Sequence, residues 1–259
     1  DLGGRLEVIP PWPLIDELRP EACHDNPFRR QHGLVEKRVF MYSGNLSLAH
    51  PIEPMFRAML HFAHRPDVVF LFVGGGAAKE QLLELLERHQ PQNIRYLPYQ
   101  PLETLHFSLS AADVHLVTMG DEMVGIVHPC KIYGAMACAR PVLLFGPRNS
   151  HLGELIERYG IGWQVDHADA AGAIATIQQI LDTDQQTLVE MGRRARAAID
   201  SSLSRHILCG QFCDVVQEVV CGSRPHACTP ENSRTVPDGS GQNDPASRCG
   251  SSSTRAASC

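Results

Sequence analysis

The sequence lacks the features that define several large classes of protein. No apolar run reaches the about 20 residues that a helix needs to cross a bilayer. The first residues, DLGGRLEVIPPWP, lack the charged start and apolar stretch of a signal peptide, and the absence of an initiating Met suggests a piece of a longer chain. No Gly-Lys-Ser/Thr or Gly-x-Ser-x-Gly occurs, which argues against a P-loop NTPase and a serine nucleophile elbow. The net charge of −6 gives no support for nucleic-acid binding.

Cysteine is present without the regularity of a disulfide framework. The chain has 9 Cys, an odd number, and the last of them crowd a polar C-terminal segment. Disulfide frameworks usually belong to small secreted domains with regular Cys spacing, so we interpret the chain as a protein of the reducing cytosol. His206, Cys209 and Cys213 share a helical face, but the spacings to later cysteines are too long for a typical zinc site, and we expect no metal.

Strand and helix patterns alternate between residues 38 and 200. This alternation implies right-handed βαβ units. We therefore predict an α/β fold, a Rossmann-like doubly wound parallel sheet of about six strands with helices on both faces. The expected strands are Val39–Tyr42, Val68–Val73, Ile94–Leu97, one from Val114, Val142–Phe145 and Gly162–Val165. The expected helices cover residues 52–64, 77–89, 102–110, 134–139, 151–159, 168–181 and 185–199.

The segments on either side of this region have a different composition. Residues 1–37 are rich in proline and are interpreted as an interdomain linker or remnant, with a short strand near Leu6–Ile9. Residues 201–221 are expected to form a C-terminal helix. Residues 222–259 hold almost no large apolar side chains and cannot offset their ordering entropy, so we expect a disordered tail.

The segment from Asp113 to Pro147 is the most informative. It reads as a strand, a polar loop, a helix of small residues and a second strand, which would place charged groups at the carboxyl end of a parallel sheet, where open α/β sheets bind ligands. Lys131 is expected at a helix start, where a cation is unfavourable unless an anionic ligand offsets it. The alternative is an ordinary solvated lysine.

Two glycine-containing turns also follow expected strands. In Ser43-Gly44-Asn45 and in Gly74-Gly75-Gly76, glycine lets the backbone approach a ligand, and a following helix would offer free N–H groups to a phosphate. Plain strand–helix turns explain the same letters without a ligand.

Together these motifs resemble the carboxyl-terminal, donor-binding half of GT-B glycosyltransferases of the retaining family-4 type. That family carries Arg and Lys in its first turn, whereas Asn45 and His50 hold those places here. The SGN…H pattern and the His128-Pro129-Cys130-Lys131 element resemble a subgroup that assembles polysaccharides. Gly134 stands where relatives carry the carboxylate that binds ribose, so that carboxylate is absent.

The resemblance assigns roles to individual residues. Glu122 would lie beside the sugar, and the segment around Pro98 and Tyr99 would lie under the nucleotide base, although Tyr99 equally suits a structural aromatic. The implied catalytic residues are Glu122 and Lys131, and the implied donor-binding residues are Ser43, Gly44, Asn45, His50, Gly75, Gly76, Pro98, Tyr99, Gly125, His128 and Tyr133.

The implied reaction transfers a sugar from a nucleotide-diphospho-sugar to an acceptor hydroxyl with retention, without a metal or other cofactor. The acceptor, a sugar or a lipid-linked glycan, would bind an N-terminal domain preceding Asp1, and that domain would provide any peripheral membrane contact of an otherwise cytoplasmic protein. Two alternatives stay open. One is a truncated or degenerate GT-B domain that binds nucleotide or a partner without catalysis, and the other is a sugar-nucleotide epimerase-type enzyme.

Overall fold

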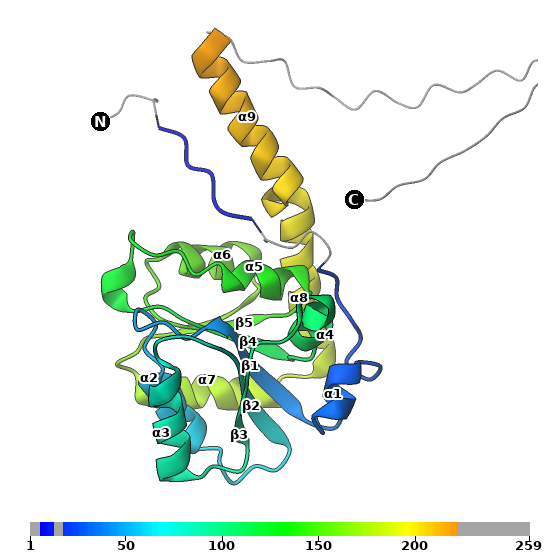
Figure 1. Cartoon of the computed structure of the whole chain (residues 1–259), viewed down its shortest axis with the longest axis vertical. Coiled ribbons are helices and arrows are strands. Elements are labelled where there is room, and N and C mark those ends of the chain that lie inside the picture. Colours follow the sequence, from blue (N-terminus) through cyan, green and yellow to red (C-terminus); the bar gives the residue numbers. More distant parts are fainter. Residues whose placement is uncertain (1–5, 13–17, 222–259) are drawn as a thin grey trace, which may run out of the picture.

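The computed structural model of the protein describes residues 6–12 and 18–221 and shows one parallel sheet between two layers of helices (Figure 1). Its strand order, β3-β2-β1-β4-β5-β6, places the two βαβ halves on either side of β1 and β4, as in a doubly wound sheet. The predicted Rossmann-like α/β fold is confirmed. The strands are β1 (Arg38–Asn45), β2 (Val68–Gly75), β3 (Ile94–Leu97), β4 (Val114–Thr118), β5 (Val142–Phe145) and β6 (Gly162–Val165).

The sheet is buried on both faces, which explains the continuous apolar runs of its strands. Along β1, Phe40 and Tyr42 enter one core cluster while Val39 and Met41 enter another. Helices α2 (Glu53–Leu60), α3 (Lys79–His89) and α7 (Ala170–Asp182) cover the first face. The opposite face carries α1 (Pro27–Gln31), α4 (Leu105–Ser110), α5 (Lys131–Ala137), α6 (His151–Tyr159) and α8 (Gln185–Ala198).

Several boundaries differ from the expected ones. The expected turns at residues 43–45 and 74–75 instead continue β1 and β2. The two strands stay paired in parallel register there, through Ser43 with Val73, Gly44 with Gly74 and Asn45 with Gly75. Helix α2 does not follow directly, since it begins only at Glu53. The strand expected near Leu6–Ile9 does not form, and the expected 102–110 helix divides into the 3-10 turn η1 (Leu102–Thr104) and α4.

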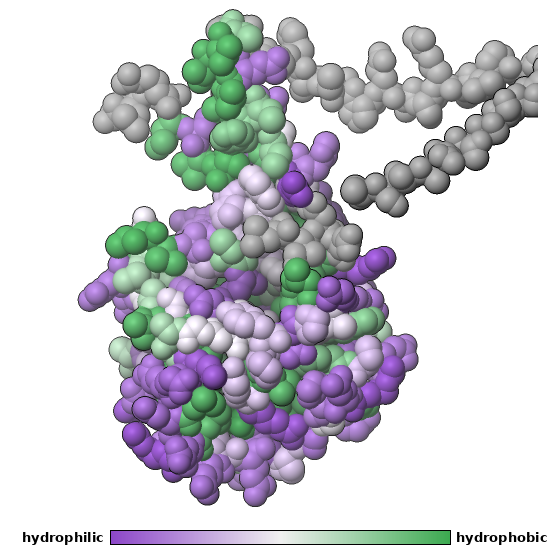
Figure 2. Space-filling view, in the orientation of Figure 1, coloured by the Kyte–Doolittle hydropathy of each residue, from purple (hydrophilic) through white to green (hydrophobic). Residues whose placement is uncertain are grey.

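The chain ends its described part in a long helix that leaves the body of the domain. After a π-helical turn, η3 (Ile199–Leu203), helix α9 (Arg205–Cys221) extends away from the sheet (Figure 1). Its outer part carries exposed Phe212, Val216, Val219 and Val220, and apolar residues gather there in Figure 2. Among the described residues no helix is both long and apolar enough to cross a bilayer. The expected tail, residues 222–259, lies outside the described residues.

Candidate functional site

The carboxyl ends of β1 and β2 meet in a run of paired glycines. Gly44 pairs with Gly74 and Asn45 with Gly75. Gly44 and Gly74 have φ angles of 122° and 141°, and a Cβ on Gly74 would lie 2.0 Å from the carbonyl oxygen of Gly44. Only glycine allows this approach. Gly44 itself has no atom within 4 Å of the position that its Cβ would take, so its outer side is open space.

Lys131 reaches this open edge from the first turn of α5. Its Nζ donates to the Tyr42 hydroxyl and, at 3.3 Å, to the carbonyl oxygen of Asn45. It also lies 3.8 Å from the centre of the Tyr42 ring, a cation–π contact. Burial lowers the pKa of Lys131 to about 7. No carboxylate of the described residues pairs with it, so the ammonium has only neutral partners.

His50 lies buried in the same cavity as Lys131 and is neutral at pH 7. Burial, and then the charge of Lys131, lower the pKa of His50 to about 4. Its Nδ1 is buried without a hydrogen-bond partner among the described residues. His50, which stands where the resembled family carries Lys, therefore brings no positive charge to the cavity near neutral pH.

One cavity of about 500 Å³ gathers these groups, and its lining is both polar and apolar. Ser43, Asn45, His50 and Lys131 are among its polar residues. Six apolar side chains, here called the apolar wall, also line it, so the cavity offers an ammonium together with a surface on which a flat ring can pack. These apolar residues are Trp12, Leu18, Val73, Leu102, Leu105 and Leu109.

Two tyrosines, Tyr96 and Tyr99, contact the glycines at the end of β2. The Tyr96 hydroxyl donates to the Gly74 carbonyl at 2.8 Å, and that of Tyr99 donates to the Gly75 carbonyl at 3.3 Å. Tyr99 is 60% exposed and lines the 500 Å³ cavity. An exposed ring held by its hydroxyl at a cavity mouth is well placed to stack on a ligand.

A second, smaller cavity of about 230 Å³ lies beside the loop that precedes α5. Gly125, His128 and His151 are among its lining residues. The buried Tyr133 hydroxyl lies 3.0 Å from Nε2 of His128 and 3.3 Å from Nε2 of His151. Burial raises the pKa of Tyr133, and burial together with His151 lowers the pKa of His128 to about 4. His128 and Tyr133 are therefore uncharged at neutral pH, and the Tyr133 hydroxyl links the two histidine rings.

The structure does not gather all the residues that the sequence singles out. Glu122 lies exposed in the 3-10 turn η2 (Asp121–Met123) and lines neither cavity. Gly75, Gly76 and Pro98 also lie outside the lining of both. A Cβ on Gly76 would lie 2.1 Å from the side-chain oxygen of Asn45, so this glycine serves the contact between the two strand ends.

Some residues that line the cavities, or that hold Lys131 in place, carried no signal in the sequence. Tyr42 reads only as a strand residue, and its one hint is a hydroxyl in an otherwise apolar run. The apolar wall from Trp12, η1 and α4 comes from separate segments whose side chains look like ordinary core. His151 was missed because its role depends on the distance between α5 and α6, which the sequence does not encode locally.

Comparison with known proteins places these features in a family. A family model described as glycosyl transferases group 1 matches residues 25–198. The protein named probable glycosyltransferase WbjE from Pseudomonas aeruginosa is 28% identical over 219 residues, which are 85% of this chain and 54% of WbjE. The amylovoran biosynthesis glycosyltransferase AmsK of Erwinia amylovora is 26% identical over 155 residues, 58% of this chain and 37% of AmsK.

A solved structure supports the architecture. Anabaena HepE, crystallised in complex with UDP and glucose, aligns with a TM-score of 0.64 at 18% identity, over 77% of this chain and 53% of HepE. At this identity the likeness establishes the fold alone. The chain spans 54% of WbjE, about half the length of that curated relative.

Proposed function

The chain belongs to the glycosyl transferases group 1 family, and from this premise we propose that its carboxyl-edge cavity binds the nucleotide-diphospho-sugar donor of a glycosyl transfer. The observation that carries the proposal is the joining, in one cavity of about 500 Å³, of an ammonium without a carboxylate partner and an apolar wall. A diphosphate would pair with Lys131 while the base packs on the apolar side chains. HepE, a fold relative, was crystallised with UDP, which supports this class of ligand.

The chemistry that this arrangement favours is departure of the nucleotide diphosphate from the anomeric carbon. Negative charge grows on the leaving phosphate in the transition state, and a positioned ammonium stabilises it. Tyr42 and the Asn45 carbonyl hold that ammonium in place. We further propose the retaining course and the hexosyl donor that the family resemblance implies. Binding is proposed to need no divalent cation, so EDTA should leave the affinity for UDP unchanged.

The complete reaction also needs an acceptor site. We propose that a second domain supplies it, because family members such as WbjE are about twice as long as the matched region. AmsK is named for amylovoran biosynthesis, which supports a growing glycan, free or lipid-linked, as the acceptor class. A cytoplasmic location with peripheral membrane contact through the acceptor side fits such a substrate.

One observation favours a second candidate function, nucleotide binding without catalysis. No Asp or Glu stands among the residues that line the 500 Å³ cavity in the described part of the chain. A carboxylate at the ribose position is replaced by Gly134, which lines this cavity. The same absence weighs against an epimerase, which needs acid and base groups at the sugar.

Calorimetry on the 259-residue protein tests the proposal. UDP, GDP, ADP and their sugar conjugates are titrated, and at least one nucleotide should bind. Lys131→Ala should weaken that binding at least tenfold, about 1.4 kcal/mol, whereas Arg88→Ala, on the exposed end of α3, should not. A folded protein that ignores every nucleotide, or equal affinity in Lys131→Ala, overturns it. Binding without glucose, galactose or mannose transfer to glycan acceptors by the full-length protein would favour the second candidate.

A further inference from the structure

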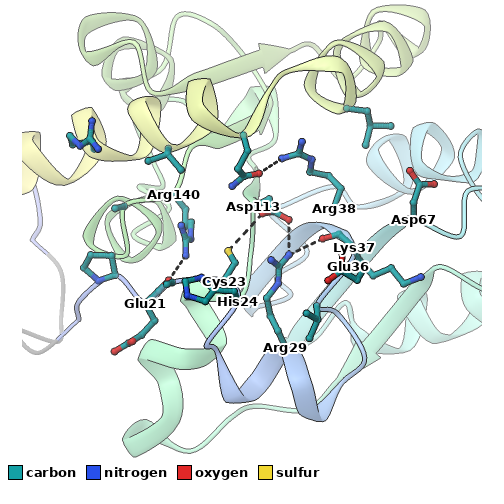
Figure 3. Close-up of a pocket in the computed structure, with 18 of the residues that line it drawn as sticks. Glu21, Cys23, His24, Arg29, Glu36, Lys37, Arg38, Asp67, Asp113 and Arg140 are labelled. Carbon is teal, nitrogen blue, oxygen red and sulfur yellow. Dashed lines mark hydrogen bonds and ion pairs between the residues drawn. The ribbon is translucent and has the colours of Figure 1, made fainter.

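A larger cavity, of about 930 Å³, lies at the opposite edge of the sheet (Figure 3). It is formed where strands begin. Arg38 is the first residue of β1, Asp67 immediately precedes β2, and Asp113 immediately precedes β4. The carboxyl-edge cavity instead lies where β1 and β2 end. The two cavities are therefore separated by the length of the strands, and the amino-edge cavity plays no part in the proposed donor site.

The amino-edge cavity is rich in cations although the chain as a whole is acidic. The chain has a net charge of −6. Among the described residues, seven Arg or Lys and four Asp or Glu line this cavity. Four of the seven cations pair with carboxylates: Arg29 with Asp113, Arg65 with Asp67, Arg193 with Glu190 and Arg196 with Asp200. The other three, which include Arg38 and Arg140, have no such partner among the described residues, and their unpaired positive charge in a concave site concentrates anions. The cationic lining residues are Arg29, Lys37, Arg38, Arg65, Arg140, Arg193 and Arg196.

Arg140 is the clearest of these unbalanced charges. Its guanidinium donates to the Ser110 carbonyl at 2.8 and 3.2 Å and to the Glu21 carbonyl at 2.6 Å. The residue is only 9% exposed, and no carboxylate of the described residues forms an ion pair with it. A buried charge held by neutral carbonyls alone keeps an uncompensated electrostatic cost, which an incoming anion would reduce.

Arg38 approaches the same cavity from β1. It donates to the Gln185 side chain at 2.8 Å and to the Thr183 carbonyl at 3.1 Å. In the described part of the chain its partners are again neutral. Figure 3 shows Arg38 and Arg140 on either side of Asp113.

The carboxylate of Asp113, between Arg38 and Arg140, already has partners within the protein. Asp113 accepts from Arg29 at 2.7 Å and from the Val39 amide at 2.7 Å, while the Cys23 thiol lies 3.8 Å from its other oxygen. Asp113 thus balances Arg29 and leaves Arg38 and Arg140 without a counter-ion. The Nε of Arg29, a residue only 3% exposed, is also buried without an acceptor.

We propose that the amino-edge cavity binds a small polyanion, a ligand that carries two or more phosphate or carboxylate groups, between Arg38 and Arg140. Two guanidinium groups on separate elements favour a ligand with separated anionic groups, because each planar fork pairs with one oxyanion. The volume of about 930 Å³ is within the range of small-molecule sites. The site is independent of sugar transfer and would remain if the proposed function were wrong.

The test uses citrate and pyrophosphate as probes in calorimetry at low ionic strength. One or both should bind the intact 259-residue protein. Adding 0.5 M NaCl should weaken the binding at least tenfold, because salt shortens the distance over which charges attract from about 10 Å at 0.1 M towards about 3 Å at 1 M. The preferred probe distinguishes phosphate from carboxylate recognition. Arg38→Gln and Arg140→Gln should each weaken binding at least tenfold.

Two controls locate the binding. Arg88→Gln removes an exposed positive charge from α3 and should leave the affinity unchanged, and Lys131→Ala should leave citrate binding unchanged because it alters the opposite edge. If Arg140→Gln fails to fold because Ser110 and Glu21 lose their donor, Arg38→Gln decides, since its partners are half-exposed or exposed. Silence toward both probes, or binding that Lys131→Ala abolishes and Arg38→Gln leaves intact, overturns the inference.

Discussion

At the scale of single residues, Lys131 illustrates how neutral partners prepare a charge for a ligand. Its ammonium contacts a phenol, an aromatic face and a carbonyl, and no anion. Burial then costs the charged form more than these contacts return, which is why the pKa of Lys131 is lowered to about 7. A lysine paired with a carboxylate would hold its proton more tightly but would be less available to a diphosphate.

This lowered pKa predicts that UDP affinity depends on pH. Below pH 7 Lys131 is protonated and its contribution to the affinity should be constant, so any change there reflects the UDP phosphate, which also titrates at about pH 6. Above pH 7 the ammonium is lost in the free protein, so the affinity should fall by up to tenfold per pH unit until the higher pKa of the complex is reached. Calorimetry between about pH 6 and pH 9 measures this. Lys131→Arg keeps its charge over the whole range and serves as the control, and an equally steep fall in that variant would refute the assignment.

The same residue affects stability with the opposite sign. The unfolded chain holds the Lys131 proton up to its usual pKa of 10.5, whereas the folded chain releases it near 7. Between these values the unfolded state binds more protons, so the contribution of Lys131 to the free energy of unfolding rises with pH. Nucleotide binding should therefore weaken over a pH range in which Lys131 destabilises the fold less.

At the scale of secondary-structure elements, the sequence predicts β3, β5 and β6 to the residue but misses the carboxyl ends of β1 and β2. The strand Val142–Phe145 is predicted to the residue because its four residues are all apolar, and the structure buries all four. The glycines at the ends of β1 and β2 predict turns there, since glycine usually marks turns. The two strands in fact pair through Gly74 and Gly75, where the absence of a Cβ permits close approach.

The candidate site was predictable where the family resemblance names a residue, or where a residue conflicts with its local setting. Lys131 at a helix start is such a conflict, and the structure places it in the cavity with Ser43, Gly44 and Asn45. Leu102 and Leu105 conflict with nothing, because apolar residues at helical spacing usually pack in a core. Their place in the cavity lining follows from the position of α4 beside the end of β1, which is a tertiary property.

Helix α8 packs so closely against the end of α5 that one methyl group added at Gly192 should force the two apart. A Cβ on Gly192 of α8 would lie 2.0 Å from the carbonyl oxygen of Ala139, just after α5. Gly192→Ala should therefore lower the free energy of unfolding by about 1–3 kcal/mol despite the better helix propensity of alanine. Urea denaturation followed by circular dichroism measures this change.

The matched control is another helical glycine. Gly210 in α9 is exposed, with no atom within 4 Å of the position of a Cβ. Gly210→Ala should raise the stability of α9 by up to about 1 kcal/mol, because only the propensity term acts there. Equal effects of the two substitutions would show that α5 and α8 are less closely packed than described.

At the scale of the whole molecule, the sheet separates two cavities of different character. The carboxyl-edge cavity combines one ammonium with an apolar wall and suits a nucleotide. The amino-edge cavity holds two guanidinium groups without carboxylate partners, those of Arg38 and Arg140, and suits a polyanion. The two cavities share no lining residue, and we therefore expect both ligands to bind at the same time.

Two thiols report on these edges separately and give the last prediction. Cys130 is exposed and lines the carboxyl-edge cavity, whereas Cys23 is half-buried and lines the amino-edge cavity. With iodoacetamide at about pH 7, where Lys131 still holds part of its charge, UDP should slow alkylation of Cys130 severalfold, and citrate should slow that of Cys23. Mass spectrometry of the peptides measures both. Cys23 should react more slowly throughout because burial raises its pKa. Cys213, exposed on α9, should respond to neither ligand. Protection of Cys23 by UDP, or of Cys130 by citrate, would show that the two ligands do not occupy separate edges.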